Sequence, residues 1–430
     1  MAASNPARVP PSRGYSRYVL GVLTVMYTFN YLDRYVLTIL VVPIQKELHL
    51  SDTTMGFLLG PAFALFYTLL GIPIARLADR RSRRLILTLA LLMWSAMTAL
   101  AGLARTGFEL AVTRIGVGIG EAGGTAPAHS LISDYFPPER RALGFGVLQQ
   151  GVYIGQLLGL VVGGVLVGVV GWRWTFVAVG APGVLVAAVL YFTVRDPERG
   201  TFVTPVPEAA TSPRLGEVFR YLWQRRSFRA LLIGCGVASF AGTGFGFWLP
   251  VLFGRVHGMS QMEVGLIFGP VTAFSAAAGS ILAGVVTDRL SARDIRWRIR
   301  IPALSVILSL PFLIGVCVYP SSLGAILCAI PAGILGGGWA PAAYSAVQGL
   351  APARMRAMAA ALLILSITFL GMGAGPQAVG ILNDLLADRF GTDAVRYSMV
   401  IVISISALGS LLLFRGSRFY VADVEEATRS

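Results

Sequence analysis

Twelve apolar stretches run along the chain, and each is long enough to cross the hydrocarbon core of a bilayer as a helix, which takes about 20 residues. Their approximate bounds are 18–42, 54–75, 85–104, 107–132, 142–170, 174–194, 229–253, 262–287, 301–319, 323–347, 357–381 and 396–415. In lipid, a helix satisfies every backbone polar group within its own segment. We therefore predict an all-α integral membrane protein with twelve transmembrane helices.

The composition agrees with this prediction. Of 430 residues, 55% are hydrophobic and 13% charged, against about a quarter charged in a typical soluble domain. The net charge of +14 raises the question of a polyanionic partner such as nucleic acid. The cations lie between the apolar stretches, however, and form no soluble basic face interleaved with aromatic residues. We expect no nucleic-acid partner.

One long polar break divides the twelve stretches into two sets of six. It is rich in arginine and contains proline, and within it Leu215–Trp223 has the spacing of an amphipathic helix at the membrane surface or packed under the bundle. The predicted organisation is an N-terminal tail (1–17), a six-helix bundle (18–194), a linker (195–228), a second six-helix bundle (229–416) and a C-terminal tail (417–430).

The loops differ in charge, which predicts an orientation. With both termini and the linker on one side, the segments on that side carry 27 Lys and Arg residues, and the loops on the other side carry six. The side richer in Lys and Arg stays in the cytoplasm. We therefore expect both termini and the linker to be cytoplasmic.

The two sets of six also repeat each other in sequence. The segment GGTAP, which ends at Pro127, recurs as GGGWAP, which ends 214 residues later at Pro341. Pro138 is likewise followed by Pro352 at the same offset. Two sequence motifs that recur at the same offset indicate duplicated six-helix units, as in many transporters.

Several motifs resemble those of a known family. The loop Gly71–Arg84 (GIPIARLADRRSRR) resembles the signature loop of the major facilitator superfamily, with Ala75 and Ser82 where glycines are common. The segments Asn30–Leu37, Arg114–Gly146 and Gly246–Pro250 resemble the Spinster family of lipid transporters within that superfamily. The resemblance implies the major facilitator fold, two pseudo-symmetric bundles that alternate access, and transport of a lipid.

Four charged residues lie inside the predicted spans: Asp33, Arg34, Arg114 and Glu121. Such charges are costly in a membrane and are usually functional. Arg114 and Glu121 are seven residues apart and share one helix face. Pairing of Asp33 with Arg114 and of Glu121 with Arg34 would neutralise the cluster. One interpretation is a structural pair of ion bridges that holds the first and fourth helices together.

The other interpretation is a titratable site coupled to the substrate. An arginine beside a carboxylate favours its ionised form, and the carboxylate takes up a proton when the arginine moves away. The offset of 214 carries Arg114 and Glu121 onto the apolar Cys328 and Leu335, which favours a function over architecture. The resemblance implies the same roles. We assign proton coupling to Asp33, Arg114 and Glu121, and contact with the polar head of the substrate to Arg34 and Glu121.

The loop after the second span has a separate predicted role. Its arginines serve in part as a positive-inside anchor. By resemblance, Asp79 would also latch the cytoplasmic ends of helices two and eleven in the outward-open state, near Arg140. The predicted gating residues are Asp79, Arg80, Arg83, Arg84 and Arg140.

The predicted function is secondary active transport of an amphipathic lipid, such as a lysophospholipid or a sphingosine phosphate, coupled to protons. Phe63, Tyr67, Phe240 and Trp248 would line the cavity, although aromatic residues in a membrane bundle more often only pack. The alternatives are a proton-linked organic anion or drug transporter and, more distantly, a lipid receptor or a membrane enzyme. We expect a monomer in a bacterial inner membrane, with no cofactor, no metal and no catalytic residues.

Overall fold

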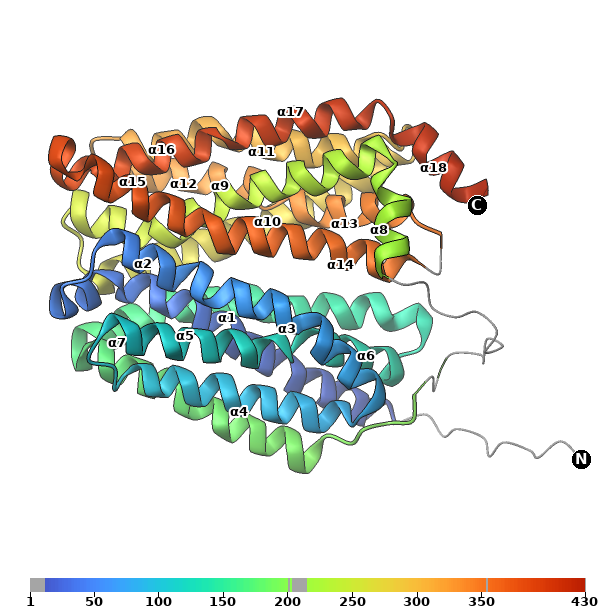
Figure 1. Ribbon diagram of the computed structural model, residues 1–430, viewed down its shortest axis with the longest axis horizontal. Helices are drawn as coiled ribbons and strands as arrows, with labels where there is room; N and C mark the ends of the chain where they lie inside the picture. Colours follow the sequence, from blue (N-terminus) through green and yellow to red (C-terminus); the bar gives the residue numbers. More distant parts are fainter. Residues whose placement is uncertain (1–11, 200–201, 203–214, 353–354, 430) are drawn as a thin grey trace, which may run out of the picture.

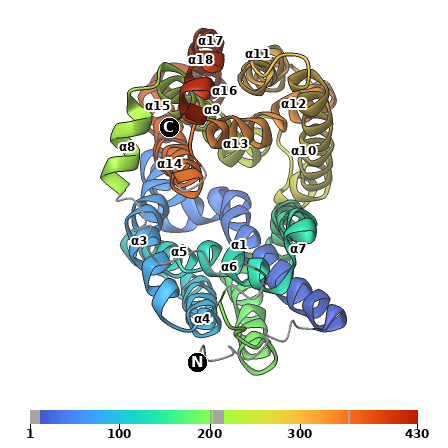
Figure 2. The same ribbon diagram turned by 90° about the vertical axis from the view of Figure 1, so that its right-hand side faces the viewer.

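The computed structural model describes residues 12–199, 202, 215–352 and 355–429, and these residues form helices and short connections without a strand. The helices run side by side in two groups, which Figure 1 shows one above the other. The lower group holds the first half of the chain and the upper group the second half. Seen end-on in Figure 2, the two groups face each other. This is the expected pair of six-helix bundles.

The first half contains seven helices in the described residues. Their bounds are α1 Arg13–Leu48, α2 Asp52–Leu59, α3 Pro61–Arg80, α4 Arg83–Ala101, α5 Gly107–Ala122, α6 Thr125–Tyr135 and α7 Pro138–Thr193. The 56 residues of α7 would extend about 84 Å, far more than one crossing needs. The chain reverses within it at Gly171, whose φ of 78° suits glycine. Spans five and six therefore share α7.

The second half follows the same plan. Its elements are α9 Arg226–Val256, α10 Gln261–Ser291, α11 Trp297–Val318, α12 Ser322–Gly336, α13 Trp339–Gly349, α14 Arg356–Ser366, the π-helix η2 Ile367–Ala374, α15 Gly375–Phe390, the short η3 Gly391–Asp393, α16 Ala394–Ser404 and α17 Ser406–Ser417. Spans ten, eleven and twelve are each built from more than one element.

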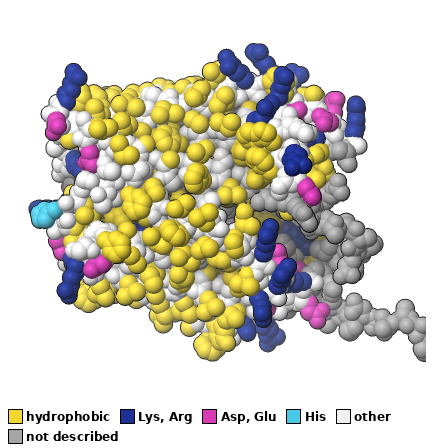
Figure 3. All heavy atoms as spheres, in the orientation of Figure 1, with side chains coloured by type: hydrophobic (Ala, Val, Ile, Leu, Met, Phe, Trp, Pro, Cys, Tyr) yellow, Lys and Arg dark blue, Asp and Glu magenta, His cyan; other side chains and the backbone are white. Residues whose placement is uncertain are grey.

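Eight continuous helical segments of the described chain are long and apolar enough to cross a membrane. Two of them, Pro138–Thr193 and Met358–Ser417, are long enough for two crossings. The remaining two spans are α1 and the pair α5 and α6, which carry the four buried charges. On the face shown in Figure 3, a broad apolar band lies between charged side chains at the two ends.

The structure confirms the internal repeat. The fourth span breaks at Gly123 and Gly124, and the tenth breaks at Gly337 and Gly338, 214 residues later. The helices after the two breaks, α6 and α13, begin and end at the same offset. The repeated motif therefore marks a repeated change of direction within a span.

Two further helices lie at the end where α1 begins. We call it the basic end, because the arginine-rich loops after α3 and α10 are there. The predicted amphipathic helix is α8 Leu215–Trp223, with Val218 and Leu222 fully buried against the second half. The predicted C-terminal tail instead contains α18 Tyr420–Arg429, and the buried Tyr420 hydroxyl donates to the carbonyl of Ala346 at 3.0 Å.

Candidate functional site

The structure brings the four predicted intramembrane charges together between α1, α4 and α5. Asp33, Arg34, Arg114 and Glu121 are 1%, 7%, 4% and 0% exposed. We call them the charge cluster. Two positive and two negative groups leave no net charge, which makes a buried cluster tolerable in the membrane interior.

Arg34 and Glu121 form the pair that the sequence analysis expected. The Nε and Nη2 atoms of Arg34 donate to Oε2 of Glu121 at 2.7 and 2.6 Å. The other carboxylate oxygen, Oε1, is buried without a hydrogen-bond partner in the described structure. Arg34 therefore binds the Glu121 carboxylate through one of its two oxygens.

The second expected pair, Asp33 with Arg114, does not form in this structure. Asp33 accepts a hydrogen bond from Thr98 of α4 at 3.0 Å through Oδ2. Its Oδ1 and the Nε of Arg114 are buried, and neither has a hydrogen-bond partner among the described residues. Successive residues on a helix point about 100° apart, so the Asp33 side chain contacts α4, whereas the Arg34 side chain contacts α5.

Aromatic side chains surround Arg34. The guanidinium lies over the rings of Tyr31, Phe63 and Tyr67 at 4.7, 4.9 and 5.1 Å from their centroids, and Arg114 lies 5.6 Å from the centroid of Phe63. Cation–π contacts stabilise a cation that is removed from water. Phe63 and Tyr67 therefore pack against the charge cluster, and neither lines the cavity between the halves, where they were expected.

The charge cluster also touches the second half of the molecule. Nη1 of Arg34 lies 3.7 Å from the sulfur of Met372 in η2. Short π-helical segments in helices often occur at functional sites. Sequence analysis missed Met372 and Thr98, because neither carries a charge or a motif. Tyr31 had a weak signal, since it lies one helical turn before Arg34.

A cavity of about 350 Å³ lies between the halves. The first half contributes Tyr35, Gln156 and Leu160, and the second half contributes small and apolar residues of α9 to α13. Phe240 and Trp248 do not line it in this structure. Trp248 is fully buried, and its indole N–H donates to the carbonyl of Pro376 at 2.9 Å, which supports packing of α9 against α15.

The halves are joined at the end opposite the basic end. Arg255 of α9 makes two 2.6 Å bonds to the carboxylate of Asp52 in α2 and a 2.7 Å bond to Gln45 of α1. Asp384 of α15 accepts hydrogen bonds from the backbone N–H groups of Asp52 and Thr53 at 3.1 and 2.8 Å. A carboxylate from one half thus caps a helix of the other.

A further ion pair at this opposite end stays within the first half. Trp172 donates to Glu47 at 2.6 Å, and Arg173 donates to it at 2.7 Å. The Trp172 hydrogen bond is the main reason that the pKa of Glu47 lies below its ordinary value. These contacts hold the end of α1 against the turn inside α7.

The predicted gating residues at the basic end make few contacts. The side chains of Asp79, Arg80 and Arg140 are exposed, and they form no hydrogen bond or ion pair within the part of the chain that the structure describes. Arg84 lies over the ring of Tyr191, 5.1 Å from its centroid. Within the described residues, Asp79, Arg80, Arg84 and Arg140 therefore do not act as a latch between the halves in this conformation.

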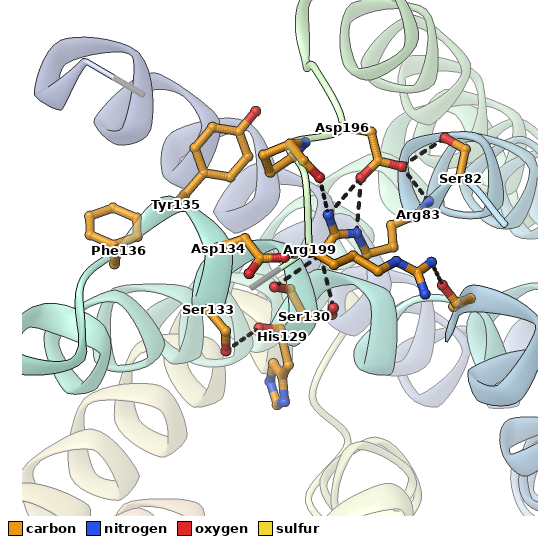
Figure 4. A network of polar contacts seen from close by, with 12 residues as sticks. Ser82, Arg83, His129, Ser130, Ser133, Asp134, Tyr135, Phe136, Asp196 and Arg199 are labelled. Carbon is orange, nitrogen blue, oxygen red and sulfur yellow. Dashed lines mark hydrogen bonds and ion pairs between the residues drawn. The ribbon is translucent and has the colours of Figure 1, made fainter. Parts of the chain in front are cut away.

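Arg83 is different, because it is 1% exposed and held within the first half (Figure 4). Its Nε donates to Asp196 at 2.9 Å, its Nη1 pairs with Asp134 and donates to Ser130 at 3.1 Å, and its Nη2 donates to the carbonyl of Pro197 at 2.6 Å. This network ties α4, α6 and the start of the linker together. A gating role for Arg83 stays a prediction.

Among the described residues, no group of three or more His, Cys, Asp and Glu side chains could hold a metal ion.

A family model described as Major Facilitator Superfamily matches residues 23–376. The chain is 31% identical over 420 residues to an MFS-type efflux pump of Mycolicibacterium smegmatis, covering 97% of this chain and 96% of the pump. It is 28% identical to protein spinster homolog 3 of Danio rerio, covering 99% and 89% of the two chains.

The sphingosine-1-phosphate transporter SPNS2 of Danio rerio is 25% identical, with 95% of this chain and 85% of that protein covered. A crystal structure of a bacterial homolog to the human lysosomal transporter Spinster, inward-facing and unoccupied, matches with a TM-score of 0.86, 30% identity, and coverage of 96% and 99%. The chain therefore belongs to the major facilitator superfamily and, within it, to the Spinster family of membrane transporters.

Proposed function

We propose that this transporter moves an amphipathic lipid with a phosphate head, such as a lysophospholipid or a sphingosine phosphate, by alternating access coupled to protons. The observation that carries the proposal is the Arg34–Glu121 pair, which is buried in the first half and touches Met372 of the second. A charge at the junction of two moving bodies can bias their arrangement.

Proton coupling is supported by the polar atoms that the cluster leaves without partners. Buried polar groups without partners cost about 1–3 kcal/mol each, and the cluster holds three, on Asp33, Glu121 and Arg114. Protonation of Asp33 would remove its buried negative charge. Movement of Arg114 toward Asp33 would favour the ionised form of Asp33 again. We therefore place the proton switch at Asp33 and Arg114.

Substrate coupling follows from Glu121. Protonation of Glu121 would weaken its hold on Arg34, whose planar guanidinium suits a phosphate. A phosphate head at Arg34 and a proton on Glu121 would then favour each other. Tyr67, which is half-buried beside Arg34, would contact the same head group.

A lipid cargo also needs space for an apolar chain. The cavity between the halves is lined mainly by apolar and small residues, and Tyr35 lies on α1 next to Arg34. Two of the relatives are named for Spinster or for sphingosine-1-phosphate transport. The efflux pump relative favours a second candidate, a drug or organic anion transporter of the same superfamily.

The positive-inside rule places the basic end in the cytoplasm. With that orientation, the contacts at the opposite end support an inward-facing conformation, in which Asp79, Arg80 and Arg140 are not paired with any described residue. We expect a monomer in a bacterial inner membrane that uses the proton gradient across it.

Substrate competition in proteoliposomes tests the cargo. A fluorescent lysophospholipid is taken up with and without a pH gradient, in the presence of unlabelled sphingosine phosphate, sphingosine or a small carboxylate. We expect competition from sphingosine phosphate alone, because only it combines the phosphate with the chain. Uptake of small carboxylates or cationic dyes without lysolipid movement would favour the second candidate.

A further inference from the structure

A second pocket, of about 300 Å³, lies at the basic end of the first half, away from the charge cluster. It is formed where α1 begins, α6 ends and α7 begins. Three arginines line it, Arg13, Arg17 and Arg140, together with Tyr135 and Phe136. We call it the arginine pocket.

The arginines of this pocket have no counter-ion among the residues that the structure describes. All three are exposed, and their guanidinium groups make no hydrogen bond or ion pair in the described chain. Glu139 in the first turn of α7 is exposed and pairs with none of them. Three cations around one hollow attract an anion, and the free N–H groups at the start of α7 add to the positive potential.

Ser16 also lines the hollow, and it is only 4% exposed. Its hydroxyl can donate a hydrogen bond to a bound anion. The pocket therefore offers a donor as well as charge.

At the same end of the second half, the start of α9 is paired with carboxylates of the chain itself. Near the start of α9, Ser227 donates through its backbone N–H and its hydroxyl to Asp423 of α18, at 2.9 and 2.5 Å. Arg225 lies 3.6 Å from the carboxylate of Glu426, also in α18. A serine and an arginine at the start of the first helix of this half thus receive carboxylates from the chain itself.

The same helix α18 covers the end of α13. A Cβ at Gly349 would lie 2.8 Å from the Tyr420 hydroxyl. The residue 214 positions earlier is Tyr135, which lines the arginine pocket. Within the described residues, no acidic helix covers the first half in this way.

We propose that the arginine pocket binds the phosphate of an anionic phospholipid in the leaflet at the basic end. Arg17 directly precedes the first predicted span, which places the pocket at the depth of lipid head groups. Tyr135, Phe136 and Phe202 give it aromatic walls, which are typical of the membrane interface. Basic pockets on the cytoplasmic side of membrane proteins bind such head groups. This site is independent of the transported cargo.

Native mass spectrometry of the purified full chain tests the proposal. Phosphatidylglycerol and phosphatidylcholine with identical acyl chains are titrated against the protein. We expect one molecule of phosphatidylglycerol to bind in preference to phosphatidylcholine. Combining Arg13→Gln with Arg17→Gln should weaken that binding about tenfold or more, since each cation near a head group contributes on the order of 1 kcal/mol. Ser16→Ala should weaken it to a smaller extent.

The matched control combines Arg229→Gln with Arg293→Gln, which removes two exposed, unpaired arginines from the same end of the second half. Equal weakening by both double variants would show general charge attraction and overturn the site. Equal competition by soluble glycerol phosphate or inorganic phosphate would overturn the lipid assignment. Each variant is first compared with the wild type in unfolding temperature, and unchanged lipid binding by a folded Arg13→Gln, Arg17→Gln variant would also overturn the proposal.

Discussion

Arg34 and Glu121 form an ion pair whose members are only 7% and 0% exposed. Removing two charges from water costs several kcal/mol for each ion, and a buried pair is often no more stabilising than apolar residues of similar volume. Stability alone therefore does not explain the pair. The structural and functional interpretations of these residues predict different behaviour in variants.

Removal of one partner should damage the fold, and removal of both should not. We expect Glu121→Ala to lower the free energy of unfolding by about 3–5 kcal/mol, because it leaves Arg34 charged and unpaired. Arg34→Met combined with Glu121→Met should be as stable as the wild type and should not transport. Thermal unfolding and proteoliposome uptake measure the two effects. A double variant that transports at the wild-type rate would leave the pair with a structural role only.

At the scale of helices, the contacts between α2, α9 and α15 keep the opposite end shut. Arg255 pairs with Asp52, and Asp384 caps the start of α2. None of these residues was singled out from the sequence, because each appears there as an ordinary loop charge. Their partners lie more than 200 residues away, so only the fold brings them together.

Loss of the Asp52 charge should favour opening at this end. We expect Asp52→Asn to shift the balance between conformations by about 1–3 kcal/mol, a typical coupling free energy. Phe108 and Leu323 are both exposed and can be replaced by spin-labelled residues. Double electron–electron resonance between the two labels should then report a longer distance between the halves. Glu109→Gln removes a carboxylate from the same end that bonds only within its own half, and it should leave the distance unchanged.

Close helix packing at the same end offers an uncharged test. A Cβ at Gly380 of α15 would lie 2.3 Å from the backbone oxygen of Asp52, so α15 and α2 cannot keep their distance if it is replaced. Gly380→Ala should therefore open this end, and a cysteine introduced there should react faster with a thiol reagent. Gly284→Ala serves as the control, because a Cβ at Gly284 would have no atom within 4 Å. Equal labelling of the two variants would contradict the role of this contact.

At the scale of the whole molecule, the spans, the two halves and their repeat followed from the sequence. Hydropathy and the offset of 214 are local or periodic signals, and both survive in the fold. The charge cluster was found because ionisable groups in apolar stretches stand out. The pairing of Asp33 with Arg114 was wrong for this conformation, since sequence does not give the rotation of each helix in its bundle.

Other features lay beyond sequence reasoning for the same kind of reason. Met372 reaches Arg34 only because the two halves face each other. All four aromatic residues that were expected in the cavity lie outside its lining because of helix rotation: Phe63, Tyr67, Phe240 and Trp248. The helix α18 lies in a stretch that is polar overall, so nothing in its hydropathy separated it from a tail.

The central claim is that lipid movement and proton movement share one site at Asp33. The most direct measurement follows proton flux with a pH-sensitive dye inside proteoliposomes when a lysophospholipid gradient is imposed. We predict that the wild type moves protons with the lipid, and that Asp33→Asn moves lipid along its gradient without protons. Proton movement by Asp33→Asn at the wild-type ratio to lipid would contradict the account.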